Sequence, residues 1–306
     1  LFRLLRPRQW VKNFALFAAV TFTGELFNPT AVYPVILGFF VFCGISSASY
    51  IINDIIDIKN DKLHPFKKFR PLAHGDVNIT LAAGIAFALI LGSLAVASFV
   101  NFTFFLFVIV YLLLQIMYST FLKTITVIDI LAIAAGYILR VYGGEFASGY
   151  HISVWLLLTT ISISLFLAIG KRRSELTLIS ASKLENISAT RKTLSHYSER
   201  LLDVYAAIFA TSTFIAYSLF TFLEDPAGIH LAFGEVLLPD IPNLQRKWLM
   251  LTIIPVVYGL MRYLQDIYEK NEGESPEKVL FSDKPLLITI GIWVAMVIFI
   301  IYFIQP

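Results

Sequence analysis

The stretch "NDIIDIKNDKLHPFKKFRP" (residues 53–71) places three carboxylates and then a run of cations directly after an apolar segment. If that segment is a helix that continues through Asn53, then Asn53, Asp57 and Asp61 recur every four residues and Asp54 precedes Asp57 by three, so all four point toward one side. Carboxylates this close repel one another unless a cation neutralises them. The spacing therefore predicts a cation site.

Oxygen ligands in this arrangement suit Mg²⁺, which keeps several waters and usually bridges to substrate phosphates. The predicted metal ligands are Asn53, Asp57 and Asp61, and the predicted catalytic carboxylates are Asp54, Asp57 and Asp61. Lys67 and Arg70 follow, and they supply positive charge for the same phosphates, Arg70 through a bidentate fork. A magnesium-bound diphosphate is thus the predicted ligand. The alternative is a solvated loop whose charges only mark the membrane boundary.

The composition is that of a membrane protein, with 58% hydrophobic residues, 15% charged residues and a mean hydropathy of +0.76. Nine apolar runs are mostly long enough to cross about 30 Å of hydrocarbon as helices. They cover residues 13–27, 33–52, 79–100, 102–121, 126–147, 152–170, 203–222, 249–265 and 285–304. We therefore expect an all-α polytopic membrane protein with nine transmembrane helices and a single catalytic domain over residues 1–306.

The distribution of charge predicts the orientation. Sorted by the loops between these runs, 21 of the 24 Lys and Arg residues fall on one side of the membrane. Positive loops face the cytoplasm, so we expect a cytoplasmic N-terminus, an external C-terminus and a cytoplasmic-side active site in a cell membrane, inner or plasma. The net charge of +3 is too small to indicate a nucleic-acid partner.

At this point the sequence resembles a known family. "NDIIDIKND" matches NDxxDxxxD, the first signature of the UbiA superfamily of intramembrane prenyltransferases. "LRPRQWVKN", "DILAIAAGYILRVYGG" and "GKRRSEL" are most similar to its decaprenyl-phosphate phosphoribosyltransferase branch. The resemblance implies a UbiA-like bundle that transfers 5-phosphoribosyl from 5-phosphoribosyl 1-diphosphate (PRPP) to a polyprenyl phosphate, with Mg²⁺ as cofactor and diphosphate as product.

The other candidate substrate-binding residues are polar groups at or within the apolar runs. Tyr118 and Lys123 end the fourth run, where the superfamily often places Tyr and Lys near the diphosphate; both types are also ordinary interface anchors. Asp129 and Arg140 lie about 16 Å apart on one helical face, too far to pair with each other. Arg140 could meet the lipid phosphate or a buried carboxylate, with Glu145 as the structural alternative. Asp129 could accept ribose hydroxyls or bind a second metal.

The remaining candidates are cationic. Lys171, Arg172 and Glu175 lie in "GKRRSEL", where a typical superfamily member has a second acidic motif, DxxxD, that this sequence lacks. A cationic stretch there can hold the 5-phosphate of PRPP, although positive-inside topology alone would also produce it. Lys12 and Asn13 could reach the lipid phosphate or anchor the first helix. Tyr197 and Asp203 flank the seventh run and could shape the site, although neither is among the predicted site residues.

Two rival functions stay open. A conventional UbiA enzyme would move a prenyl group from prenyl diphosphate to an aromatic acceptor, and it would need the missing second acidic pair. A lipid-sugar transporter would show two related halves with broken helices at mid-membrane, and no such repeat is evident. The sequence leaves the lipid chain length and the oligomeric state open.

Overall fold

The structure, a computed structural model, describes residues 2–63, 67–181, 196–224, 248–269, 279 and 281–304. Every regular element in these ranges is helical. The α-helices are α1 (Ala18–Phe22), α2 (Pro29–Leu63), α3 (Pro71–His74), α4 (Ile79–Val100), α5 (Phe102–Thr120), α6 (Ile128–Ser148), α7 (Val154–Ala181), α9 (Glu199–Leu223), α12 (Ile253–Glu269) and α14 (Lys284–Phe299). The shorter helical turns are η1 (Phe2–Leu5), η2 (Pro7–Phe17), η3 (Lys67–Phe69), η4 (Leu122–Thr124), η6 (Leu249–Thr252) and η7 (Ile300–Ile304).

Seven of the described helices are long and apolar enough to cross a membrane, not the nine that the sequence predicted. They are α2, α4, α5, α6, α7, α9 and the final helix over Lys284–Ile304. The predicted run 13–27 folds as the 3-10 turn η2 and the five-residue α1, because Gly24, at φ 81°, stops the helix early. The predicted run 249–265 folds as η6 and the 17-residue α12, which carries Arg262 and Asp266. The protein is nevertheless a multi-pass membrane protein.

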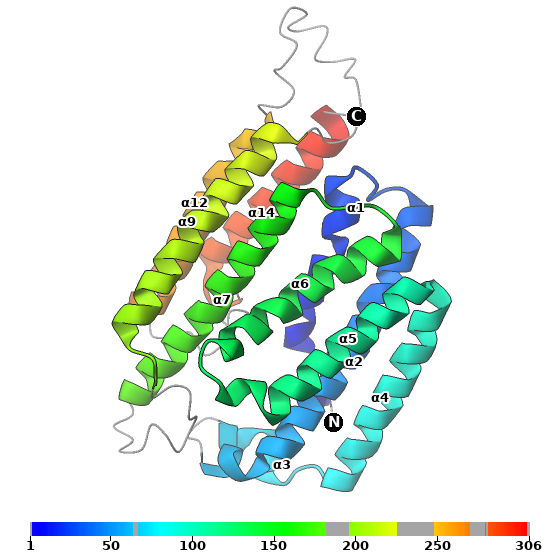
Figure 1. Cartoon of the computed structure of the whole chain (residues 1–306), viewed down its shortest axis with the longest axis vertical. Helices are drawn as coiled ribbons and strands as arrows, with labels where there is room; N and C mark the ends of the chain where they lie inside the picture. The colour runs from blue at the N-terminus through cyan, green and yellow to red at the C-terminus, as the bar shows by residue number, and fades with distance from the viewer. Residues whose placement is uncertain are drawn as a thin grey trace, which may run out of the picture.

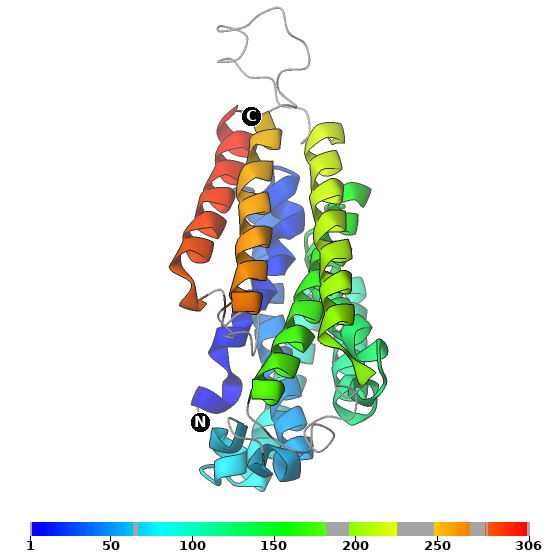
Figure 2. The same ribbon diagram turned by 90° about the vertical axis from the view of Figure 1, so that its left-hand side faces the viewer.

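The helices lie roughly along one long axis (Figure 1). α2 packs against α4, α5 and α6, whereas α7 packs against α6 and α9, so α6 joins the two groups. α12 and α14 pack against each other, and α14 ends near the C-terminus, at the end of the molecule opposite α3 (Figure 2). At the opposite end of the chain, the N-terminal turns η1 and η2 pack against α2.

The length of α2 brings the acidic stretch out of the apolar bundle. Its 35 residues extend for about 52 Å at 1.5 Å per residue, well beyond a hydrocarbon layer of about 30 Å. The helix continues through Asn53 without a break, as the sequence predicted. The carboxylates of its last three turns consequently lie at one end of the bundle.

A glycine sets the position of the N-terminal segment. A Cβ on Gly144 of α6 would lie 1.8 Å from the carbonyl oxygen of Leu16 in η2, which shows direct contact between the two backbones. Only glycine permits this approach. Arg140, one turn earlier on α6, is thereby brought against Asn13 of the same N-terminal segment.

Candidate functional site

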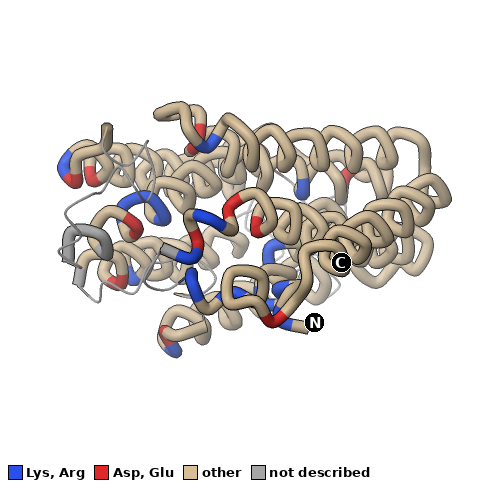
Figure 3. Tube along the Cα trace, turned by 90° about the horizontal axis from the view of Figure 1, so that it is seen from below, with Lys and Arg blue, Asp and Glu red and all other residues tan. Residues whose placement is uncertain are grey.

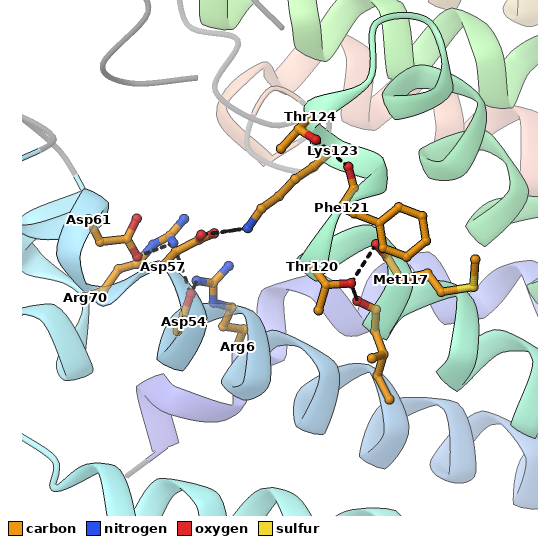
Figure 4. A network of polar contacts seen from close by, with 11 residues as sticks. Arg6, Asp54, Asp57, Asp61, Arg70, Met117, Thr120, Phe121, Lys123 and Thr124 are labelled. Atoms are coloured by element: carbon orange, nitrogen blue, oxygen red, sulfur yellow. Dashed lines mark hydrogen bonds and ion pairs between the residues drawn. The ribbon is translucent and has the colours of Figure 1, made fainter. Parts of the chain in front are cut away.

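The acidic end of α2 is surrounded by cations from three other segments (Figure 4). Arg6, between η1 and η2, donates from Nη2 to both carboxylate oxygens of Asp54, at 2.5 and 2.7 Å. Arg70, just before α3, donates from Nη1 to Asp54 at 3.0 Å and to Asp61 at 2.7 Å. Asp54 and Asp61 are buried, at 2% and 4% exposure. Two guanidinium groups thus neutralise two carboxylates that could not be buried alone.

Asp57 has a different partner. Lys123, in the turn η4, donates from Nζ to both Asp57 oxygens, at 2.6 and 2.8 Å. The two residues are 66 positions apart in the sequence, and sequence reasoning placed both at the site without pairing them. The pair joins the turn after α5 to the acidic end of α2. Seen from this end of the molecule, acidic and basic positions are interspersed near the centre of the bundle (Figure 3).

The side-chain oxygens at the end of α2 suit a magnesium ion bound to diphosphate better than an ion held by protein ligands alone. Within the described ranges, no group of three or more His, Cys, Asp or Glu side chains is arranged to hold a metal ion. Mg²⁺ commonly takes only one or two carboxylates and completes its shell with waters and substrate phosphates. The half-buried side chains of Asn53 and Asp57 offer oxygens of the right kind at this helix end. Their role as ligands, with Asp61, stays a prediction.

A second group of charges lies where α6 and α7 meet. The fully buried guanidinium of Arg172 places Nε 2.7 Å from Asp129 Oδ2, an ion pair without the alignment of a hydrogen bond. Its Nη1 donates to Glu175 at 2.5 Å and its Nη2 donates to the Tyr118 hydroxyl at 3.0 Å. The structure therefore brings together four residues that the sequence singled out separately. Glu175 pairs with Arg172, one turn away. In this ion pair each group neutralises the other, because a buried charge left unpaired would be costly.

Tyr197 completes this group, although the sequence indicated only that it could shape the site. Its hydroxyl donates to Asp129 Oδ1 at 2.8 Å and accepts the backbone N–H of Val127 at 2.7 Å. Burial raises the pKa of this hydroxyl, so it stays a proton donor at neutral pH. No local pattern marks Tyr197, because its partners are 68 and 70 residues away.

Arg140 forms a third, separate group inside the bundle. Its Nε donates to Asn13 Oδ1 at 2.8 Å, its Nη1 to the Gly136 carbonyl at 2.6 Å and its Nη2 to the Tyr111 hydroxyl at 2.6 Å. Its guanidinium also lies 4.9 Å from the ring centre of Tyr111 and 5.7 Å from that of Tyr137. The alternative pairing with Glu145 does not occur, because Glu145 contacts His151 at 2.8 Å.

The partners of Arg140 are all neutral. Among the residues that the structure describes, no carboxylate forms an ion pair with it, yet it is 96% buried. Lys12 adds a second cation, with Nζ 5.8 Å from the same Tyr137 ring. A guanidinium at membrane depth whose described partners are all neutral favours an anionic ligand. Tyr111 was not predicted as a site residue, since it lies inside an apolar run.

A chain of contacts connects the Arg140 group to the acidic end of α2. Lys12 donates to Gln9 Oε1 at 2.6 Å, and the Tyr50 hydroxyl donates to the same oxygen at 3.2 Å. Arg6 lies 5.2 Å from the centre of the Tyr50 ring and also bonds Asp54. The N-terminal segment therefore runs from one group to the other. Arg6 was missed because an arginine ahead of a membrane segment reads as an anchor.

The last two predicted residues lie at the edges of these groups. Lys171 directly precedes Arg172 on α7 and is half-buried. Lys67 lies in η3, three residues before Arg70, and is also half-buried. The neighbouring Arg173 ties α7 to α9 through Asp203 and Glu199, at 2.8 and 3.0 Å.

The bundle and its charged end define a multi-pass membrane protein with a candidate active site built from α2, α6, α7 and the N-terminal segment. The chain belongs to the UbiA prenyltransferase family, whose family profile matches residues 14–283. It is accordingly an enzyme of the transferase class.

Proteins of two actinobacteria are similar to it over nearly their whole length. Decaprenyl-phosphate phosphoribosyltransferase of Corynebacterium glutamicum is 32% identical, over 98% of this chain and 86% of the relative. The enzyme of the same name from Mycolicibacterium smegmatis is 32% identical, over 99% and 92%. Among solved structures, a UbiA homologue from Archaeoglobus fulgidus bound to DMAPP and Mg²⁺ is similar in fold, with a TM-score of 0.70 and 21% identity over 98% of both chains.

Proposed function

We propose that this protein transfers the 5-phosphoribosyl group of PRPP to a polyprenyl phosphate and releases diphosphate, in a Mg²⁺-dependent reaction. Relatives named decaprenyl-phosphate phosphoribosyltransferase match nearly the whole chain, which supports both substrates. The related structure bound to DMAPP and Mg²⁺ supports a metal in this fold. Residues 1–306 would act as one catalytic domain.

The observation that carries the proposal is the Arg140 group. Within the described residues the buried Arg140 guanidinium has neutral partners, and Lys12 lies beside the same tyrosine ring, which suits an acceptor that brings its own negative charge. A polyprenyl phosphate does so, and its hydrocarbon tail can stay among apolar helices. A neutral aromatic acceptor would leave the buried charge without a counter-ion. Conventional prenyl transfer would also need the second acidic motif, which this sequence lacks. We therefore favour the lipid phosphate over the conventional prenyl-transfer chemistry.

The acidic end of α2 would receive the donor. Asn53, Asp57 and Asp61 would hold Mg²⁺, which would neutralise the diphosphate and stabilise the charge that develops as it leaves. Lys123 already lies against Asp57 and Arg70 against Asp61, while Arg6 lies against the neighbouring Asp54. These three cations would contact the diphosphate oxygens. Lys67, Lys171 and Arg172 are the proposed partners of the 5-phosphate, and Asp129 that of a ribose hydroxyl.

In the reaction, an oxygen of the lipid phosphate forms a bond to ribose C1 while the bond from C1 to the diphosphate oxygen breaks. The lipid phosphate is already an anion at neutral pH, so no protein base is required. The work of the protein is to bring two polyanions together, with Arg140, Lys12 and Asn13 holding the acceptor and the α2 end holding the donor. The surrounding apolar helices exclude water, which would otherwise hydrolyse PRPP.

We also propose that the acidic end of α2 faces the cytoplasm, with the N-terminus inside and the C-terminus outside a cell membrane. Support comes from the sorting of Lys and Arg residues among the loops, and PRPP is a water-soluble donor that the site would then draw from the cytoplasm. Cysteine substitutions at Asp76 and at Tyr150, tested with an impermeant thiol reagent in intact cells, check this topology. Labelling of D76C from outside the cell would contradict it.

An acceptor comparison tests the function. Purified protein in lipid nanodiscs receives labelled PRPP and Mg²⁺ together with polyprenyl phosphate, with the matching polyprenol, or with an aromatic acid and prenyl diphosphate. We expect a labelled lipid only with polyprenyl phosphate, and none after chelation of Mg²⁺. Equal product from the polyprenol would refute the proposal, because a polyprenol carries no phosphate for the cations around Arg140. A prenylated aromatic product would refute it as well, because that is the product of conventional prenyl transfer.

A further inference from the structure

We propose that Tyr197 is a positioning residue of this enzyme: its hydroxyl fixes the loop that carries Lys123 and thereby keeps the Lys123 ammonium on Asp57. The inference rests on the proposed function only in taking Lys123 and Asp57 to hold the donor diphosphate. The geometry of the loop itself is independent of the reaction.

The Tyr197 hydroxyl bonds two parts of the chain at once. It accepts the Val127 N–H at 2.7 Å and donates to Asp129 Oδ1 at 2.8 Å. Tyr197 is 5% exposed and lies just before α9, whereas Val127 and Asp129 flank the start of α6. A phenol hydroxyl is needed, because it must accept one hydrogen bond and donate another.

Val127 is held in a strained backbone conformation. Its φ is 70° and its ψ is −45°, and a positive φ is a genuine outlier for a β-branched residue. Within the described backbone, Arg6 is the other non-glycine residue with positive φ, and its guanidinium bonds Asp54. Such conformations persist only where the surroundings fix them, and they gather at functional sites. The hydrogen bond from Val127 N–H to the Tyr197 hydroxyl is one contact that fixes the strained backbone conformation at Val127.

The strained residue is rigidly connected to Lys123. Asp129 N–H donates to the Ile125 carbonyl at 3.0 Å, and Ile125 N–H donates to the Leu122 carbonyl at 3.2 Å. Consecutive turns thus link the start of α6 to η4, which carries Lys123. Because Lys123 reaches Asp57 at 2.6 Å, a shift of the loop at Val127 would move the ammonium away from the carboxylate.

Asp129 extends the connection to the second group of charges. Its Oδ2 faces Arg172 Nε at 2.7 Å, and Arg172 in turn bonds the Tyr118 hydroxyl at 3.0 Å. Tyr197 therefore lies where the loop that carries Lys123 meets the buried cation of α7. Removal of its hydroxyl releases the loop and leaves Asp129 Oδ1 without this donor.

The test compares Tyr197→Phe with the matched control Tyr302→Phe. The Tyr302 hydroxyl also accepts a backbone N–H, from Leu26 at 2.8 Å, and donates to a carbonyl, but it lies at the other end of the bundle. We expect Y197F to raise KM for PRPP about tenfold, the order of effect of two ordinary hydrogen bonds, with KM for polyprenyl phosphate unchanged. We expect amide hydrogen exchange of residues 121–128 to accelerate in Y197F alone. Y302F should match the wild type in both measurements.

A second variant separates positioning from general destabilisation. Glycine adopts positive φ without strain, so Val127→Gly in the Y197F background should recover part of the lost affinity for PRPP. Equal rises in both KM values, or unchanged exchange at residues 121–128, would overturn the proposal. If the wild-type protein transfers no phosphoribosyl group but amide exchange at residues 121–128 is still faster in Y197F, the loop contact is upheld and the proposed function is refuted.

Discussion

Arg140→Lys tests the proposal that the group around Arg140 selects the acceptor. The substitution keeps the positive charge but replaces a planar fork by a point charge. Arg140 makes three hydrogen bonds, at 2.6 to 2.8 Å, to Asn13, Gly136 and Tyr111. A lysine at this position cannot direct donors to all three while also facing a phosphate, so we expect the cation to move from its place between Tyr111 and Tyr137.

The magnitude follows from the bonds at risk. A hydrogen bond to a charged group contributes about 1.5–3 kcal/mol, and about 1.4 kcal/mol corresponds to a factor of ten in rate. Loss of one such bond in the transition state should therefore lower kcat/KM for polyprenyl phosphate by about ten- to hundredfold. KM for PRPP should change by less than about threefold, since the proposed donor site lies at the end of α2.

The assay measures initial rates in nanodiscs, with each substrate varied in turn. Arg262→Lys is the matched control, because Arg262 also forms charged hydrogen bonds, to Asp283, but between α12 and α14. It should retain wild-type kinetics. Full activity of R140K, or a loss confined to PRPP, would refute the assignment of Arg140 to the acceptor.

Three further results are expected. Asp57→Asn should lower turnover at least about hundredfold, since it removes a predicted metal ligand and the partner of Lys123 without changing side-chain volume. The control Asp76→Asn, at an exposed carboxylate paired with His74, should have no effect in the same assay. An active D57N would exclude the metal role of Asp57. Gly144→Ala should lower the free energy of unfolding by about 3 kcal/mol or more, because the new methyl group meets the Leu16 carbonyl. The loss is read from the thermal unfolding temperature in detergent. The control Gly92→Ala, whose methyl group has nothing within 4 Å, should leave this temperature unchanged or slightly raised. Removal of Mg²⁺ by chelation should abolish turnover but leave the thermal unfolding temperature of the wild-type protein unchanged, since Arg6, Arg70 and Lys123 neutralise the carboxylates of α2 without a metal. Unfolding on chelation would show that the ion is structural.

Local spacing was sufficient to predict the acidic helix. Asn53, Asp57 and Asp61 belong to one continuous helix, because periodicity within a single element is a local property. The count of membrane helices was too high for a related reason. Apolar length alone does not reveal that Gly24 stops α1 or that the described part of α12, Ile253–Glu269, is interrupted by Arg262 and Asp266.

The pairings between segments were beyond the sequence. Lys123 and Asp57 were both selected, yet nothing local shows that a turn after α5 reaches α2. Arg140 was expected to meet the lipid phosphate or a buried carboxylate. Its described protein partners are neutral, and its contact with the lipid phosphate stays a prediction. Tyr197 and Arg6 act through residues tens of positions away, which is why only the tertiary structure identifies them.

The most direct test follows the lipid phosphate itself. Polyprenyl [³²P]phosphate and PRPP labelled with ¹⁴C in the ribose are incubated with the enzyme and Mg²⁺, and the lipid product and the diphosphate are quantified. We predict one lipid that carries both labels, with one diphosphate released for each molecule formed, because the acceptor oxygen attacks carbon and the phosphate is retained. A product that has lost the ³²P label, or diphosphate release without any doubly labelled lipid, would contradict it.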